Sequence, residues 1–148
     1  MSGKILGVDF GTVRVGLAIS DVDRKFAFPL EMLRRQTKEQ DATFFAELVK
    51  NEAVTMIVVG LPVHLSGDEG QKAYEARQFG KWLGEVTGLP IVFYDERFTT
   101  VQAESALWEA GLTHKKRKAR RDQVAAQILL QTYLEAGCPE NPQTGHLG

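Results

Sequence analysis

KILGVDFGTVRVGLAIS, the stretch from Lys4 to Ser20, decides the fold. It consists of two apolar runs rich in β-branched residues, separated by Gly11 and the two residues after it. Two such runs on either side of a short glycine-containing turn predict an antiparallel β-hairpin. The next apolar run, Phe26 to Leu33, contains Pro29. Because proline has no N–H to donate, we expect this third strand at a sheet edge or with an irregularity.

Downstream of the hairpin, helical and strand patterns alternate. Thr37 and Gln40 have the spacing of a capping box, which predicts a helix start. We expect helices over 37–52, 71–86, 99–110 and 122–136, and buried strands over 56–60 and 91–94. The order β-β-β-α-β-α-β-α-α predicts an α/β fold with a mixed five-stranded sheet, whose first three strands are antiparallel and later ones parallel, with helices on both faces. We expect residues 1–137 to form one domain and residues 138–148 a flexible tail.

Composition points to a soluble protein. The chain has 148 residues, of which 43% are apolar, and this length suits a single domain. Its lone cysteine, Cys138, cannot form an internal disulfide, and no Cys/His cluster has zinc-ligand spacing. The start lacks the pattern of a signal peptide, and no apolar run approaches the roughly 18 residues of a membrane span. We therefore expect a cytoplasmic location without membrane association.

Charge is distributed unevenly along the chain. The formal net charge is −1, yet six of the 18 basic residues lie in one segment, the predicted linker before the last helix: Lys115, Lys116, Arg117, Lys118, Arg120 and Arg121. The rest of the chain therefore carries 12 basic against 19 acidic residues. Such a segment is either a solvated surface or a grip for a polyanion such as nucleic acid.

Acidic residues occur at three places where apolar elements begin or end. Asp9 lies near the end of an apolar strand, where a buried carboxylate needs a cation, hydrogen bonds or a proton, although the Gly11 turn could also supply those hydrogen bonds. Asp95 and Glu96 directly follow a predicted buried strand. Since adjacent strand residues point to opposite faces, we expect at most one of them to share a site with Asp9. Asp122 begins the apolar stripe of the last helix, although an acid in the first helical turn is also favoured by the helix dipole.

Three carboxylates that meet at one edge of the sheet would have the chemistry of a metal site. Hard oxygen ligands select Mg²⁺ or Mn²⁺, and one or two such ions support phosphoryl chemistry. Asp9, Asp122 and one of the pair Asp95 and Glu96 are the predicted ligands and catalytic residues. The basic segment would bring a phosphate backbone to them.

Four segments in register carry a family resemblance: DFGTVRVG (Asp9 to Gly16), VGLPVHLSG (Val59 to Gly67), DERFTT (Asp95 to Thr100) and RDQVAAQILLQTYLE (Arg121 to Glu135). Together they resemble the YqgF/RuvX family of Holliday-junction resolvases, also described as pre-16S rRNA nucleases. The resemblance implies a ribonuclease H-like fold similar to the RuvC resolvases, a bacterial cytoplasmic location and a divalent-metal nuclease site.

The resemblance also implies roles for individual residues. Asp9, Glu96 and Asp122 match the family's acids, so the resemblance makes these three the predicted ligands and catalytic residues and leaves Asp95 as a second-tier ligand. It also suggests that Arg14 and Arg97 orient those acids or touch phosphate. His64 stands where the family has an asparagine, so it is a second-tier candidate for a nucleic-acid contact. Phe98 is a second-tier nucleic-acid contact for another reason, since an exposed ring beside the site could stack on a base. In the RuvC resolvases the corresponding glutamate follows the fourth strand, whereas Glu96 follows the fifth predicted strand.

The sequence is compatible with several functions. The leading one is an Mg²⁺- or Mn²⁺-dependent endonuclease that processes the 5′ end of pre-16S rRNA or resolves four-way DNA junctions. Symmetric junction cleavage would require a homodimer. One alternative is nucleotide hydrolysis, because DFGT also resembles the phosphate-binding hairpin of actin-like and sugar-kinase ATPases. Another is a scaffold that binds nucleic acid without cutting it.

Overall fold

A computed structural model describes residues 3–11, 13–62, 70–95 and 114–139, and for 114–123 it describes only the helical backbone. The elements in chain order are β1 (Lys4–Asp9), β2 (Arg14–Ser20), β3 (Ala27–Pro29), β4 (Leu33–Arg34), α1 (Lys38–Asn51), β5 (Val54–Leu61), α2 (Gln71–Thr87), β6 (Ile91–Asp95) and α4 (His114–Glu135). The helix predicted over 99–110 lies outside the described residues. No helix within the described part has the length and apolar character needed to cross a membrane.

The sheet is mixed, as predicted. Its main order is β3-β2-β1-β5-β6, with β1–β2 and β2–β3 antiparallel and β1–β5 and β5–β6 parallel. Within the described residues it has six strands instead of the expected five, because β4 also pairs with β2. The predicted third strand is thus two short strands. β3 lies at the sheet edge and ends at Pro29, which cannot continue the ladder of N–H donors.

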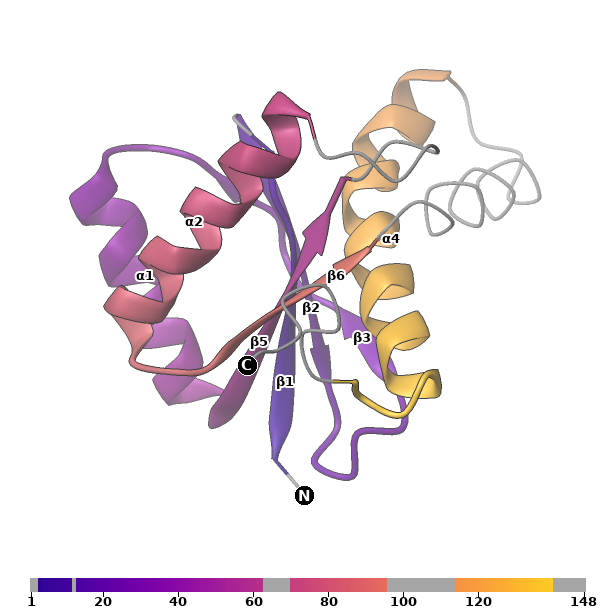
Figure 1. The fold of residues 1–148 in the computed structure, drawn as a ribbon. Coiled ribbons are helices and arrows are strands. Elements are labelled where there is room, and N and C mark those ends of the chain that lie inside the picture. Colours follow the sequence, from indigo (N-terminus) through magenta and orange to yellow (C-terminus); the bar gives the residue numbers. More distant parts are fainter. Residues whose placement is uncertain (1–2, 12, 63–69, 96–113, 140–148) are drawn as a thin grey trace.

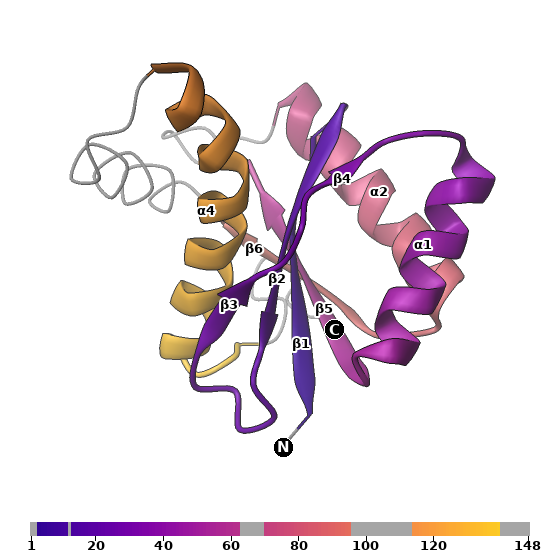
Figure 2. The ribbon, with the colours of Figure 1, turned by 180° about the vertical axis from the view of Figure 1, so that it is seen from behind.

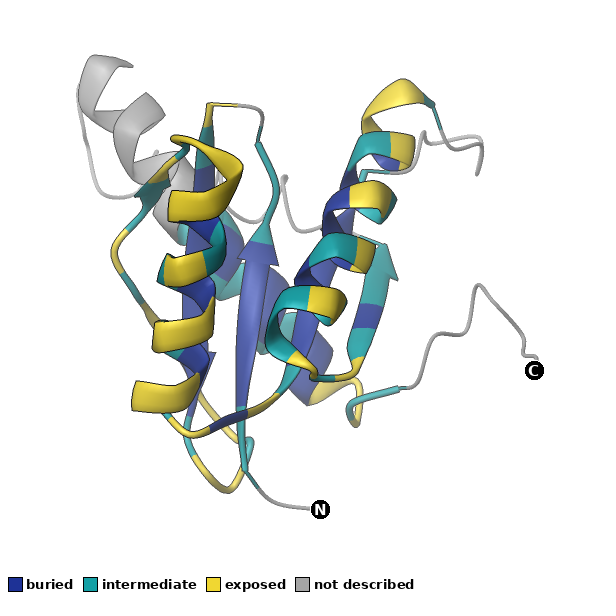
Figure 3. Ribbon diagram, turned by 90° about the vertical axis from the view of Figure 1, so that its left-hand side faces the viewer, coloured by how far each residue is buried: buried dark blue, intermediate teal, exposed yellow. Residues whose placement is uncertain are grey.

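Helices cover both faces of this sheet, which Figures 1 and 2 show from opposite sides. α1 and α2 pack on one face, which we call the α1/α2 face, and α4 packs on the other, the α4 face. Alternate residues of β1 divide between them: Leu6 and Val8 join the α1/α2 core, whereas Ile5 joins the α4 core. From the α1/α2 side, buried strands lie behind helices whose outer surfaces are exposed (Figure 3).

Local chemistry explains where the first two helices begin or end. The capping box predicted for α1 is present, since the Gln40 N–H donates to Thr37 Oγ1 at 3.1 Å and the Thr37 N–H donates to Gln40 Oε1 at 3.3 Å. α2 ends at Gly88, whose φ of 71° lies in the left-handed region that favours glycine. These two ends therefore agree with sequence-level signals.

The start of the last helix differs from the prediction. The six basic residues were expected in a linker before a helix beginning at Asp122, but α4 begins at His114 and includes them. Lysine and arginine are good helix formers, and no glycine or proline interrupts residues 114–135. The basic segment is therefore presented on about two turns of continuous helix, which fixes its position along the helix axis.

Candidate nuclease site

Asp9 ends β1 on the α4 face of the sheet. Successive strand residues alternate between faces, and Ile5 and Gly7, which precede it by four and two positions, both contact α4. Its directly opposite partner in β2 is Gly16, which has no side chain to cover it. Asp9 is half-buried and has interactions within the protein. A partly shielded carboxylate thus lies at the carboxyl end of β1, a central strand of the sheet.

Arg14 lies on the same face as Asp9. It precedes Gly16 by two residues in β2 and is therefore a diagonal neighbour of Asp9 across the hairpin. Its own opposite partner is Arg34 of β4, a residue that the sequence patterns did not single out. Like charges placed directly opposite each other are unfavourable in a sheet. β2 and β4 therefore place two arginines on the face of the sheet that carries Asp9, which suits an anionic ligand.

α4 approaches this end of β1 closely. A Cβ atom added to Gly7 would lie 2.9 Å from the Leu130 Cβ and 3.5 Å from the Ala126 carbonyl oxygen, so the helix rests directly on the strand. α4 and β1 run in opposite directions, and the N-terminal half of α4 lies toward the end of β1 that carries Asp9 (Figures 1 and 2). Asp122 precedes Ala126 by four residues, about one helical turn. The backbone position of Asp122 is therefore displaced from Ala126 toward Asp9.

Asp95 does not share the face of Asp9. It ends β6 opposite Leu61 of β5, and Leu61 packs with Phe10 and Phe93 on the α1/α2 face. The preceding residue, Tyr94, points to the α4 face and stacks edge-on against Tyr133, with ring centroids 5.3 Å apart. Burial raises the pKa of Tyr94 above its ordinary value, and the negative charge of Asp95 raises that pKa further. The structure thus separates Asp95 from Asp9 by the thickness of the sheet.

Several predicted site residues lie outside the described part of the chain. These are His64, Glu96, Arg97 and Phe98, together with the side chains of Asp122 and of the basic segment Lys115 to Arg121. Among the side chains that are described, no three His, Cys, Asp or Glu residues gather as a metal-binding group. Of the three predicted ligands, Asp9 is the one whose side chain the structure describes, so the trio stays a prediction.

The sheet order and the position of Asp9 define a class. A hairpin followed by parallel strands, with helices on both faces of the sheet, is the ribonuclease H-like fold of the resolvases. The chain is similar in fold to *Thermus thermophilus* RuvC in complex with Holliday junction substrate, with a TM-score of 0.59 at 15% identity over 93% of this chain and 98% of that one. It is also similar to the Fowlpox virus resolvase, with a TM-score of 0.55 at 12% identity over 92% and 99%.

Sequence comparison gives the family. The family model RuvX, described as Holliday junction resolvase, matches residues 3–136, and the chain belongs to this family. A relative from *Rhodopirellula baltica* named "Putative pre-16S rRNA nuclease" is 47% identical over 98% of this chain and 84% of its own length. A relative of the same name from *Maridesulfovibrio salexigens* is 44% identical over 88% and 97%. The chain is thus a member of a nuclease family, as the four sequence segments predicted.

Proposed function

We propose that this protein is a divalent-metal-dependent endonuclease that cuts precursor ribosomal RNA near the 5′ end of 16S rRNA. The observation that carries the proposal is the position of Asp9, at the end of β1 on the face covered by α4, the helix that includes Asp122 and the basic segment. The name shared by relatives at 38–47% identity favours RNA as the substrate. Junction DNA is the second candidate, favoured by the description of the matching family model.

Asp9, Glu96 and Asp122 would hold the metal in this proposal. Carboxylate oxygens are the donors that Mg²⁺ and Mn²⁺ prefer, and the half-buried Asp9 meets that requirement. Glu96 is preferred to Asp95 because Asp95 lies on the α1/α2 face, and neighbouring residues of an extended strand point to opposite faces. When bound, Mg²⁺ or Mn²⁺ supplies Lewis acidity and charge stabilisation at the scissile phosphate.

The basic residues would position the phosphate backbone. Arg14 and Arg34 lie on the α4 face in opposite strands, so a phosphate between them would offset their mutual repulsion. Arg97 is proposed to hold phosphate or a neighbouring acid in the same way. The basic segment of α4, Lys115 to Arg121, would add salt-dependent affinity for the strands on either side of the cut.

The test compares Asp9→Asn with Asp95→Asn, because the two variants make the same chemical change on opposite faces of the sheet. Each is incubated with a labelled precursor fragment spanning the 5′ end of 16S rRNA and with a four-way DNA junction, in Mg²⁺, Mn²⁺ or EDTA. We expect cleavage of the RNA in either metal and none in EDTA. Loss of a metal ligand costs several kcal/mol of transition-state stabilisation, so Asp9→Asn should cut at least about a hundredfold more slowly.

Asp95→Asn should stay within a few fold of the wild type, and thermal melting should show that both variants are folded. Cleavage that survives Asp9→Asn, or that persists unchanged in EDTA, would refute the metal site. An equal loss in both variants would refute the assignment of the chemistry to the α4 face. Cleavage of the junction but not of the RNA would replace the proposed substrate with the second candidate.

A further inference from the structure

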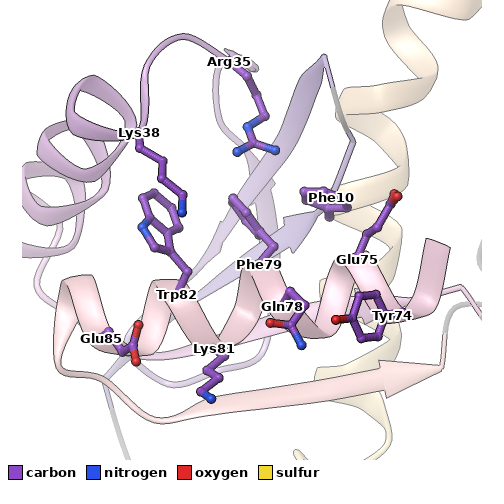
Figure 4. A pocket seen from close by; sticks show the side chains of 10 residues that line it. All are labelled: Phe10, Arg35, Lys38, Tyr74, Glu75, Gln78, Phe79, Lys81, Trp82 and Glu85. Carbon is purple, nitrogen blue, oxygen red and sulfur yellow. The ribbon is translucent and has the colours of Figure 1, made fainter. Parts of the chain in front are cut away.

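The α1/α2 face carries a cavity that the proposed nuclease site does not use. It has a volume of about 540 Å³, within the range of small-molecule sites, and lies between α2 and the segment that leads into α1. Figure 4 shows the side chains that line it, with Arg35 and Lys38 on the α1 side and Phe79 and Trp82 on α2. Phe10, the residue after Asp9, lines one end of it.

Three aromatic rings form a continuous apolar wall in this cavity. The ring centroids of Phe10 and Phe79 are 4.8 Å apart, and those of Phe79 and Trp82 are 5.5 Å apart. Phe79 is buried, whereas Phe10 and Trp82 are partly exposed. Phe79 links the two outer rings, and the partly exposed ring of Trp82 offers a π face on which a planar ligand can stack.

Arg35 is held in place above this wall. Its guanidinium carbon lies 5.1 Å from the centroid of Phe79 and 5.5 Å from that of Phe10. Its Nε is 3.5 Å from Oδ2 of Asp41, a carboxylate that is only 2% exposed, and Oδ1 of Asp41 accepts the Gln36 N–H at 3.1 Å. A cation fixed by a buried acid and two rings is positioned before any ligand arrives, which lowers the entropic cost of binding.

The remaining lining is polar and of both signs. Lys38 extends toward the cavity beside Trp82 in Figure 4, while Gln78, Glu75 and Glu85 line the α2 side. The two carboxylates would repel the backbone of a duplex or an acidic peptide. They and the amide can instead accept or donate hydrogen bonds at the edge of a base. Rings for stacking, a lysine and an arginine for a phosphate, and edge-reading polar groups together match one nucleotide.

We propose that this cavity binds one unpaired nucleotide of the nucleic-acid substrate, at a point where a single strand leaves the duplex held on the α4 face. The inference rests on the proposed function for the identity of the ligand. Phe10 directly follows Asp9, the last residue of β1, with Cα atoms about 3.8 Å apart, and their side chains point to opposite faces. A nucleic-acid strand that passes around the end of the sheet at Asp9 therefore reaches the cavity directly from the proposed nuclease site.

The test uses Trp82 as a fluorescent reporter. The chain has two tryptophans, so Trp108→Phe leaves Trp82 alone, and Asp9→Asn in the same protein prevents cleavage. The probes are an RNA duplex with a single-stranded 5′ tail, the same duplex with blunt ends, and AMP. We expect the tailed duplex to quench Trp82 by stacking and the blunt duplex to bind without quenching. Absence of quenching by the tailed duplex, whether or not AMP quenches, would overturn the proposal.

A charge reversal gives a second measurement with a matched control. Lys38→Glu should weaken binding of the tailed duplex about tenfold and leave the blunt duplex unchanged, because one phosphate contact of the tail is lost. Lys50→Glu, in the last turn of the same helix and away from the cavity, should affect both duplexes equally. A Lys38→Glu effect that is equal on both duplexes, or absent, would refute the site.

These outcomes are distinct from those of the nuclease test. Cleavage by the protein with Asp9 intact, without quenching of Trp82, would refute the nucleotide cavity alone. Quenching by the tailed duplex, combined with no cleavage of either substrate by the protein with Asp9 intact, would refute the nuclease and keep the cavity.

Discussion

The cores on the two faces of the sheet differ in how many aromatic rings they contain. On the α1/α2 face, Phe45 and Phe79 are buried and pack edge-to-face, with centroids 5.9 Å apart. On the α4 face the rings are those of Tyr133 and Tyr94, and small residues of the sheet and helix meet beside them, among them Gly7, Ala18 and Ala126. Large rings contribute most of the buried apolar area per residue, whereas small residues let a helix approach the strands closely.

In the proposed function, the α1/α2 face contributes mainly to stability and the α4 face carries the chemistry. Asp9, Arg14 and Arg34 all lie on the face where α4 approaches closely, and α4 includes Asp122 and the basic segment. A catalytic group must be held to within a fraction of an ångström, and closely packed regular elements hold it better than loops. The aromatic face, by contrast, tolerates an open cavity without disturbing that geometry.

Truncation of the aromatic core should have the largest effect on stability. Phe45 is fully buried and contacts the rings of Phe44, Phe79 and Trp82. Phe45→Ala should lower the free energy of unfolding by about 3–5 kcal/mol, as measured by urea denaturation. The half-buried neighbour serves as the control, since Phe44→Ala should cost clearly less. At temperatures below its unfolding transition, Phe45→Ala should cut saturating substrate at the wild-type rate. A variant that is folded but inactive would contradict the view that the α1/α2 face serves stability and not the reaction.

A single methyl group added under α4 should have the next largest effect. Gly7→Ala places a Cβ atom 2.9 Å from the Leu130 Cβ, and that atom cannot move unless the helix moves. We expect a loss of about 1–3 kcal/mol in urea denaturation, and a fall in cleavage rate that persists at temperatures where the protein is folded.

Gly84→Ala in α2 is the matched substitution on the other face. Its Cβ atom would lie 3.2 Å from Cγ1 of Ile91, a side chain that can adjust, and alanine is about 1 kcal/mol better than glycine inside a helix. Gly84→Ala should therefore be neutral or stabilising, with normal cleavage. Equal losses of stability and activity at the two positions would show that a contact with a fixed Cβ atom costs no more than a contact with an adjustable side chain.

Much of the fold could be predicted because its signals are local. The hairpin of β1 and β2, the capping box of α1 and the edge position of β3 each depend on a few neighbouring residues. β4 was missed because a strand of two residues, Leu33–Arg34, exists only through its pairing with β2. The start of α4 was predicted wrongly because clustered charge was given more weight than the helix propensity of lysine and arginine.

The site could be predicted only in part. Strand alternation already indicated that Asp95 and Glu96 point to different faces, but the face of Asp9 depends on how β1, β5 and β6 pair, which is a tertiary fact. The cavity had no sequence signal, because Arg35 meets Phe79 across 44 positions of the chain. Periodicity predicts that such rings are buried but does not predict which cation lies over them.

The hydrogen bonds that tie β3 to α4 should show the smallest and most local effect. Gln131 Oε1 accepts the Ala27 N–H at 2.8 Å, its Nε2 donates to the Lys25 carbonyl at 3.0 Å, and Gln127 Nε2 donates to the Ala27 carbonyl at 3.1 Å. Gln131→Ala leaves a buried N–H without its partner, so we expect a loss of about 1–2 kcal/mol.

Amide hydrogen exchange at Ala27 checks this prediction, because β3 should open more often while β1 and β5 keep their protection. Gln78→Ala, an exposed glutamine of α2 with no role in β3, is the control and should leave the Ala27 amide unchanged. If Gln131→Ala accelerated exchange along the whole sheet, β3 would be part of the cooperative core. The α4 face would then depend on side-chain hydrogen bonds for its global stability, in the way that the α1/α2 face depends on its rings.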